Sequence, residues 1–144
     1  MEKASQILKS IKNKGYRYSL ARETILDSII KSKRPLSYFD LQKLFNRKKL
    51  SVNKTTIYRE LNFLKEQNII KELQFNDDIK YYEIMPKEHH HHAVCNKCET
   101  IDHIELQQDL DAQEQSIFKN NKFKVLAHSL EFYGICNACI KSES

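Results

Sequence analysis

The sequence predicts an α+β fold in two parts. An N-terminal winged helix-turn-helix, residues 1–84, is followed by a hinge at 85–87 and a small α/β dimerisation domain, residues 88–144. Apolar residues recur at helical spacing in four successive segments of the first part, and two short β-rich runs follow them. The second part contains two C-x2-C pairs, the usual pattern of a four-thiolate zinc site.

Composition favours a folded protein without a membrane span. The chain has 144 residues, enough for one domain or two small ones, and its two glycines and two prolines leave most of it for regular structure. No apolar run reaches membrane-spanning length, and Met1-Glu2-Lys3 does not open a signal peptide. We therefore expect a cytoplasmic protein with no membrane partner, where paired cysteines more often bind metal than form disulfides.

Charge differs between the two parts. Residues 1–85 carry 18 basic and 10 acidic side chains, whereas residues 86–144 carry 6 and 9. A basic half beside an acidic half rich in histidine and cysteine suggests a nucleic-acid module joined to a metal module. A charge run can also be no more than a solvated face.

The first three helices can be placed from apolar spacing and caps. The first should end before Gly15, and the second should start after Ser19 and end near 33–35. Ser37 can cap the third, with Asp40 at the reciprocal position of a capping box. Their apolar positions are Ala4, Ile7, Leu8, Ile11, Ile25, Leu26, Ile29, Ile30, Leu41, Leu44 and Phe45.

The fourth helix, capped by Ser51 or Asn53 and ending near Gln67, has two faces. One face is apolar and should pack inward. The other offers hydroxyls, an amide and a guanidinium, groups that contact phosphates and base edges. The inward face carries Ile57, Leu61 and Leu64, and the outward face carries Thr55, Tyr58, Arg59 and Asn62.

Two β-rich runs, Ile69–Phe75 and Ile79–Ile84, follow the fourth helix around the turn signal Asn76-Asp77-Asp78. A series of helices, the last with a polar outer face, followed by a β-hairpin is typical of a winged helix-turn-helix. A small α+β interaction domain is the alternative that the pattern leaves open.

In the second part we expect strands at His90–Cys95 and Thr100–Glu105, a polar helix from Leu106 to Lys119, and a long strand at Phe123–Ile135. An unpaired edge of that long strand would invite pairing with a second copy. Zinc should bind Cys95, Cys98, Cys136 and Cys139, although two disulfides or buried thiols remain the alternative.

Four consecutive histidines, His89–His92, precede the first cysteine pair. Side chains alternate between the faces of a strand, so His89 and His91 share one face while His90 and His92 share the other. Each pair can begin a divalent-metal site. His103 and His128 lie on further predicted strands of the same domain.

Three motifs together resemble the ferric uptake regulator family, whose members sense iron, zinc, manganese, nickel or peroxide. They are Thr55–Leu61, His89–Cys98 and His128–Cys139, in the family's order and spread over nearly the whole chain. The resemblance implies a homodimeric repressor that binds double-stranded operator DNA. It implies structural zinc on the four cysteines.

The same resemblance assigns the remaining site residues. A regulatory site between the domains falls on Glu83, His90, His92 and His103, and a second site falls on His89, His91, Asp111 and His128. DNA contacts fall on Tyr58 and Arg59, and on Arg17 and Arg22 near the first two helices. With the helix's polar face, the expected DNA-binding set is Arg17, Arg22, Lys54, Thr55, Tyr58, Arg59 and Asn62.

Two departures from the family pattern bear on the metal. Arg34 stands where the family usually has a regulatory histidine, and His103 stands where it usually has a carboxylate. A nitrogen-rich site favours Fe(II) or Zn(II), with nickel and cobalt next and manganese less suited. The missing histidine weakens the interpretation as a peroxide sensor. The lack of a spare cysteine weakens the interpretation as a zinc sensor, so iron is slightly favoured over zinc.

Two other functions fit part of the pattern. A metallo-hydrolase would need an open coordination position and a general base, and no H-E-x-x-H motif occurs. A zinc-stabilised adaptor that binds protein would lack the salt-sensitive DNA binding that phosphate contacts produce.

Overall fold

The computed structural model describes residues 2–75, 78–86 and 90–143. The chain divides into two compact units, Met1–Lys87 and Glu88–Ser144. Of the hinge expected at 85–87, Met85 and Pro86 lie in the described part and Lys87 lies outside it.

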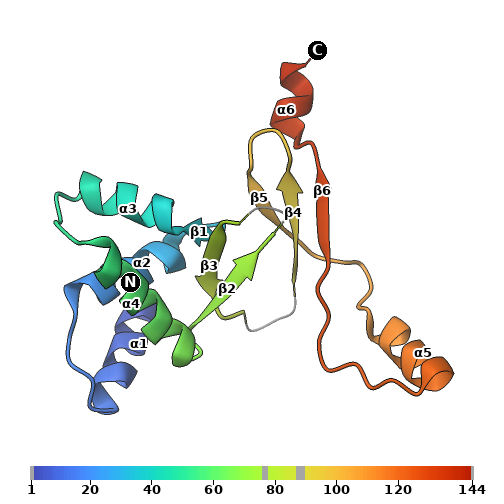
Figure 1. Ribbon diagram of the computed structural model, residues 1–144, viewed down its shortest axis with the longest axis horizontal. Coiled ribbons are helices and arrows are strands. Elements are labelled where there is room, and N and C mark those ends of the chain that lie inside the picture. The colour runs from blue at the N-terminus through green and yellow to red at the C-terminus, as the bar shows by residue number, and fades with distance from the viewer. Residues whose placement is uncertain (1, 76–77, 87–89, 144) are drawn as a thin grey trace. The chain divides into compact units, whose positions relative to one another are not determined.

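Four helices form most of the first unit (Figure 1). Each of the last three begins where a side-chain cap accepts an otherwise unpaired backbone N–H. Ser19 caps the second, and Ser37 and Asp40 form the expected capping box on the third. Asn53, rather than Ser51, caps the fourth. Their bounds are α1 Glu2–Asn13, α2 Leu20–Lys31, α3 Tyr38–Arg47 and α4 Lys54–Glu66.

A three-stranded antiparallel sheet completes this unit. Strands β2, Ile70–Gln74, and β3, Lys80–Ile84, form the expected hairpin, and the two-residue strand β1, Leu36–Ser37, pairs with the other edge of β3. Of the predicted turn, Asn76 and Asp77 lie outside the described residues. The arrangement is a winged helix-turn-helix.

The core of the first unit lies between the helices and the sheet. The inward face of α4 is fully buried, as the apolar spacing predicts, whereas Leu44 on α3 is only partly buried. Burial of this one stripe fixes which face of α4 points outward. Core side chains include Ile11, Ile25, Ile29, Leu41, Phe45, Ile57, Leu61, Leu64, Ile70 and Tyr82.

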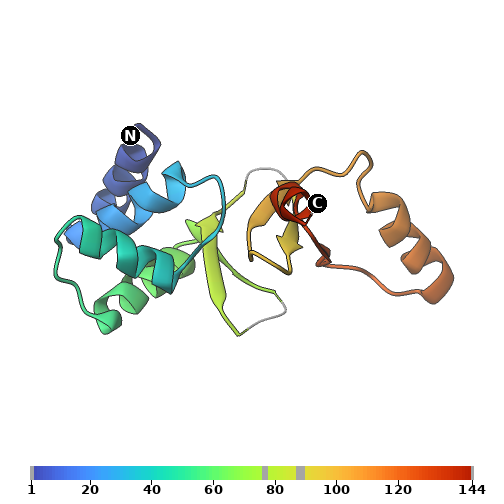
Figure 2. The same ribbon diagram turned by 90° about the horizontal axis from the view of Figure 1, so that it is seen from above.

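The second unit is built on a three-stranded sheet in the order β5-β4-β6. Its strands are β4 His91–Cys95, β5 Ile101–Ile104 and β6 Glu131–Gly134. Strand β5 is antiparallel to β4, and β6 is parallel to it. Helix α5, Asp111–Asn121, stands away from this sheet at the end of two extended segments, and the short helix α6, Asn137–Ser142, follows β6 (Figures 1 and 2).

Two expectations for this unit are wrong in extent. The helix expected from Leu106 begins at Asp111, whose carboxylate, with that of Glu114, suits the positive end of a helix. The long strand expected over 123–135 shrinks to β6, because only those residues pair with β4. Strand patterning alone does not make a strand where no described partner strand lies alongside.

Large apolar side chains on the second unit remain exposed. Helix α5 buries none of its residues, and Leu126 in the segment after it is 86% exposed. Phe118 and Phe123 are also more than half exposed. Several large exposed apolar side chains on one small unit are typical of an interaction face. Among the described residues, no helix is long and apolar enough to cross a membrane.

Candidate metal and DNA-binding sites

The four cysteines converge at one end of the second unit. Cys95 ends β4 and Cys98 lies in the turn after it, while Cys136 is the N-cap of α6 and Cys139 lies in its first turn. Their four Sγ atoms all lie within 4.8 Å of one another. The Sγ–Sγ distance is 3.8 Å for Cys95–Cys139 and 3.6 Å for Cys98–Cys136. A tetrahedron with Zn–S bonds of about 2.3 Å has S–S edges of about 3.8 Å. The free thiols are therefore spaced for zinc, and no disulfide joins them.

Backbone groups prepare this cluster for a cation. The N–H groups of Cys136, Cys98 and Lys97 donate to the Cys95 sulfur and lower the pKa of that thiol to about 6. The opposite holds for Cys139, whose hydrogen bond to Cys136 raises its pKa to about 12. Because the thiols lie too close to ionise together, a dication at their centre would let all four act as thiolates.

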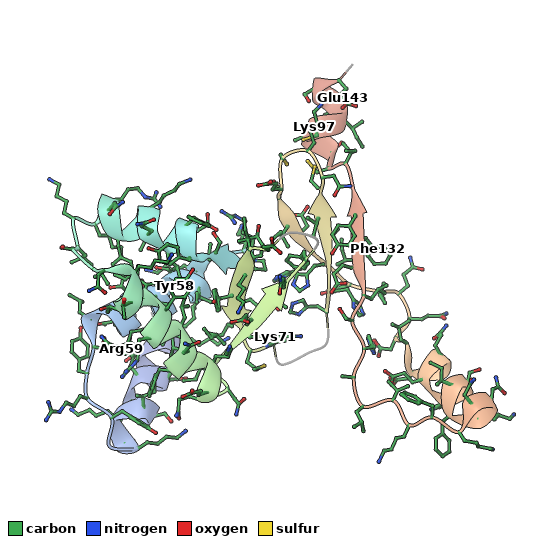
Figure 3. All side chains as sticks on the ribbon, in the orientation of Figure 1. Tyr58, Arg59, Lys71, Lys97, Phe132 and Glu143 are labelled. Atoms are coloured by element: carbon green, nitrogen blue, oxygen red, sulfur yellow. The ribbon has the colours of Figure 1, made fainter. Side chains whose placement is uncertain are left out.

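One ion pair also links the two halves of this cluster. Lys97, between the first two cysteines, contacts Glu143 just after α6 at 2.7 Å, and Figure 3 shows both at this end of the unit. Both side chains are about half exposed. An exposed pair contributes about 0–1 kcal/mol, so it adds little to what zinc would supply.

Three histidines of the second unit form a separate cluster. His92 on β4 lies directly opposite His103 on β5 in the sheet register. His90, two residues before His92, lies on the same face, as strand alternation predicts. The ring centroids are 4.4 Å apart for His90–His103, 5.0 Å for His90–His92 and 5.3 Å for His92–His103. One nitrogen from each lies within 4.8 Å of the others, so a single ion can reach all three.

The other histidine face points to a different neighbour. His91 is buried and stacks on His128 with ring centroids 5.4 Å apart. Nδ1 of His128 lies 2.7 Å from a carboxylate oxygen of Glu114 on α5. Asp111, the carboxylate expected there, is exposed one turn earlier on the same helix, and His89 lies outside the described residues.

Helix α4 presents the polar face that the sequence predicts. Thr55, Arg59 and Asn62 are exposed, and together with Tyr58 they line one shallow groove. Tyr58 is half-buried and stacks on Tyr38 of α3, with ring centroids 4.8 Å apart and planes 9° from parallel. Figure 3 shows Tyr58 and Arg59 on this helix. The stack fixes the phenol while leaving the guanidinium exposed.

The two arginines expected near the first helices differ in environment. Arg17 is exposed in the segment between α1 and α2. Arg22 is only 9% exposed, and its Nε donates to Glu60 of α4 at 2.8 Å. Lys54, at the start of α4, is exposed, with its ammonium 5.7 Å and 5.8 Å from the two stacked tyrosine rings.

Several contacts in these sites escaped sequence reasoning. Glu60 sits next to the apolar stripe of α4, and an acidic residue at a buried helical position is the signal that could have pointed to a charged partner. Glu114 could not be preferred over Asp111, because both lie in the first turn of α5. Helix α6 was also missed.

The ferric uptake regulator family model matches residues 13–133, most of the chain and all of both histidine faces. The chain belongs to this family. It is 29% identical to the ferric uptake regulation protein of Bacillus subtilis over 96% of this chain and 95% of that protein, and 30% identical to the peroxide operon regulator of the same organism over 96% and 94%. The solved structure of the Helicobacter pylori ferric uptake regulator, described as having three functional metal-binding sites, superposes with a TM-score of 0.81 at 28% identity, over 99% of this chain and 95% of that one.

Membership settles the class of function. Ferric uptake regulators are dimeric, metal-responsive, DNA-binding transcriptional repressors and not enzymes, so the chain is a regulator and the hydrolase and adaptor alternatives are wrong. Its N-terminal part is a DNA-binding winged helix and its C-terminal part is a dimerisation domain. The regulator binds a structural zinc and a regulatory metal, and the described residues include a four-cysteine cluster and a histidine cluster. Its exposed apolar surface is consistent with a second copy as the partner.

Proposed function

We propose that this regulator represses transcription when His90, His92 and His103 of the dimerisation domain, together with Glu83 of the winged helix, hold one divalent ion. The observation that carries the proposal is the gathering of the three imidazoles on one face of β4 and β5. Glu83 lies near the end of β3, the last strand of the winged helix, and its carboxylate would be the ligand from that domain.

Ligands drawn from both domains would make metal binding a conformational switch. Coordination by all four side chains would restrain the segment 85–87 and set the spacing of the two α4 helices in the dimer. The bound metal would supply only this link, by binding the DNA-competent arrangement more tightly than the open one. A coupling of about 1–3 kcal/mol corresponds to a change of about 5- to 150-fold in operator affinity.

The donor set points to Fe(II) or Zn(II). Three imidazole nitrogens and one carboxylate suit these ions, and also nickel and cobalt, better than manganese. Arg34 does not replace the family's usual histidine ligand at this position, because its guanidinium forms two hydrogen bonds of 3.3 Å to Asp40. A guanidinium has no lone pair to give to a metal.

The opposite histidine face would hold a second ion within the dimerisation domain. His91 and His128 stack together, and His89 and a carboxylate of α5 would complete the set. Of the two carboxylates in the first turn of α5, we favour Glu114 over Asp111, since Glu114 already contacts His128. Ligands from one domain should stabilise that domain more than they move it.

The outward face of α4 would enter the major groove of the operator. Arg59 is the side chain best placed for bidentate contact with a guanine, and Lys54, Thr55, Tyr58 and Asn62 would contact the backbone or neighbouring bases. Arg17 would reach the DNA from the segment before α2. We place this activity in the cytoplasm.

A fluorescence titration of operator DNA with the zinc-loaded dimer, with and without added Fe(II) or Zn(II), tests the proposal. Metal should tighten operator binding by about 5- to 150-fold and leave binding to scrambled DNA much less changed. Operator affinity that is independent of every divalent metal tested would refute a metal-dependent switch.

A further inference from the structure

Arg22 lies at the centre of a buried polar cluster in the winged helix. Its Nε donates to Glu60 Oε2 at 2.8 Å, and one terminal nitrogen donates to the backbone carbonyl of Arg17 at 2.9 Å. Arg22 and Glu60 are 9% and 7% exposed. Ser19, the N-cap of α2, donates to the other Glu60 oxygen at 3.1 Å.

The guanidinium also packs against α4. Its central carbon lies 3.8 Å from the ring centroid of Phe63, one turn beyond Glu60 on the same helix. The Phe63 ring in turn meets Tyr16 edge-on, with centroids 4.9 Å apart. Arg22 therefore joins α4 to the start of α2 and to the segment that carries Arg17.

The planar guanidinium of Arg22 is better placed to join these segments than to contact DNA. It forms directed hydrogen bonds along its edge and stacks with its face, and here both are used inside the protein. Breaking a buried ion pair leaves one charge uncompensated, so the pair resists opening. Among the described residues, no buried side-chain nitrogen or oxygen lacks a partner.

We infer that Arg22 is a positioning residue that, with Glu60, locks the recognition helix α4 and the Arg17 segment into one rigid unit for operator reading. The inference rests on the proposed DNA-binding face, with Arg17 and Arg59 as the side chains that meet DNA. Arg22 acts through them, because its guanidinium forms an ion pair with Glu60 and does not contact a phosphate.

The direction in which one substitution changes operator affinity distinguishes a positioning role from a direct DNA contact. Glu60→Gln removes a negative charge from the DNA-binding unit, so simple electrostatics predicts unchanged or tighter operator binding. If the pair positions α4, Glu60→Gln should instead weaken operator binding by about tenfold, within the range over which contacting residues couple. Binding to scrambled DNA should change less, because it depends chiefly on charge.

Salt dependence gives the second readout. The logarithm of affinity falls with the logarithm of salt concentration, with a slope of about −0.9 for each phosphate contact. Arg22→Gln should weaken operator binding while keeping the wild-type slope. Lys54→Ala, at an exposed position, is the matched control and should flatten the slope by about one contact.

The experiment measures operator and scrambled-DNA affinity across salt for metal-loaded dimers, with thermal melting to confirm folding. Arg22→Lys, which keeps the charge but loses the planar fork, replaces Arg22→Gln if that variant does not fold. The Arg22→Gln/Glu60→Gln double variant should bind no worse than Arg22→Gln alone. Wild-type-like binding by Glu60→Gln, or a flatter salt slope in Arg22→Gln, would overturn the inference. Wild-type-like binding by both Lys54→Ala and Arg59→Ala would instead reject the proposed DNA face.

Discussion

Removal of one zinc ligand should melt α6 selectively. This helix has six residues, none of them buried, and a helix so short is not stable in water by itself. Glu143, the residue just after α6, forms an exposed ion pair with Lys97, which contributes about 0–1 kcal/mol. We expect zinc ligation by Cys136 and Cys139 to be the main stabilising interaction of this helix.

We therefore expect Cys136→Ser to lose zinc and unfold residues 137–142, six of the 64 residues in the described α-helices. The far-ultraviolet circular dichroism signal of helix should fall by roughly a tenth, and more if β6 loosens as well. Hydrogen exchange followed by mass spectrometry should show the loss of protection in the peptide that contains α6, while α1–α4 keep theirs.

The matched control is Lys97→Ala, which removes the ion pair and leaves the thiols. It should retain one zinc per chain and a protected α6, with a change in unfolding free energy below about 1 kcal/mol. Native mass spectrometry counts the metal in both variants. Retention of zinc and of α6 protection in Cys136→Ser, or two disulfides and no zinc in the wild type, would show that zinc does not hold α6 in place.

Three further outcomes are expected. Arg59→Ala should lose about 1–3 kcal/mol of discrimination between operator and mismatched DNA, seen in competition gel shifts, with zinc content and dimer mass unchanged; undiminished discrimination would remove α4 from the groove. Asn53→Ala should lower the free energy of unfolding of the winged helix by about 1 kcal/mol in urea melts, since the side chain accepts a 2.8 Å hydrogen bond from the first turn of α4, whereas Ser51→Ala should have little effect. Adding metal should raise the melting temperature less in Glu114→Gln than in Asp111→Asn. A smaller rise in Asp111→Asn would instead identify Asp111 as the ligand.

Much of the winged helix follows from its sequence because its signals are local. A capping side chain three residues before a backbone N–H, as at Ser37 and Asn53, is set within one turn of chain. The apolar stripe of α4 fixes its outward face in the same way. The pairing of Arg22 with Glu60 spans 38 residues, and nothing local reports it.

The second unit is less predictable because, in the part that the structure describes, many of its large apolar side chains stay exposed. The apolar residues of 123–130 have strand character, yet within the described stretch 123–135 only the residues of β6 pair with β4. Histidine parity was predictable, since it depends only on strand alternation, and His90 and His92 do share a face with His103. Which carboxylate meets His128 depends on how α5 is oriented, and spacing does not encode that.

One histidine face should sense metal, and the other should stabilise the dimerisation domain. The most direct measurement is an operator titration across Fe(II) and Zn(II) concentrations for two variants, His90→Ala/His92→Ala and His89→Ala/His91→Ala, with dimer mass and melting temperature measured in parallel. The first variant should remain a dimer and lose metal-dependent operator binding. The second should keep that response and melt at a lower temperature. If the His89/His91 variant loses the metal response and the His90/His92 variant keeps it, the assignment of the sensing face is reversed.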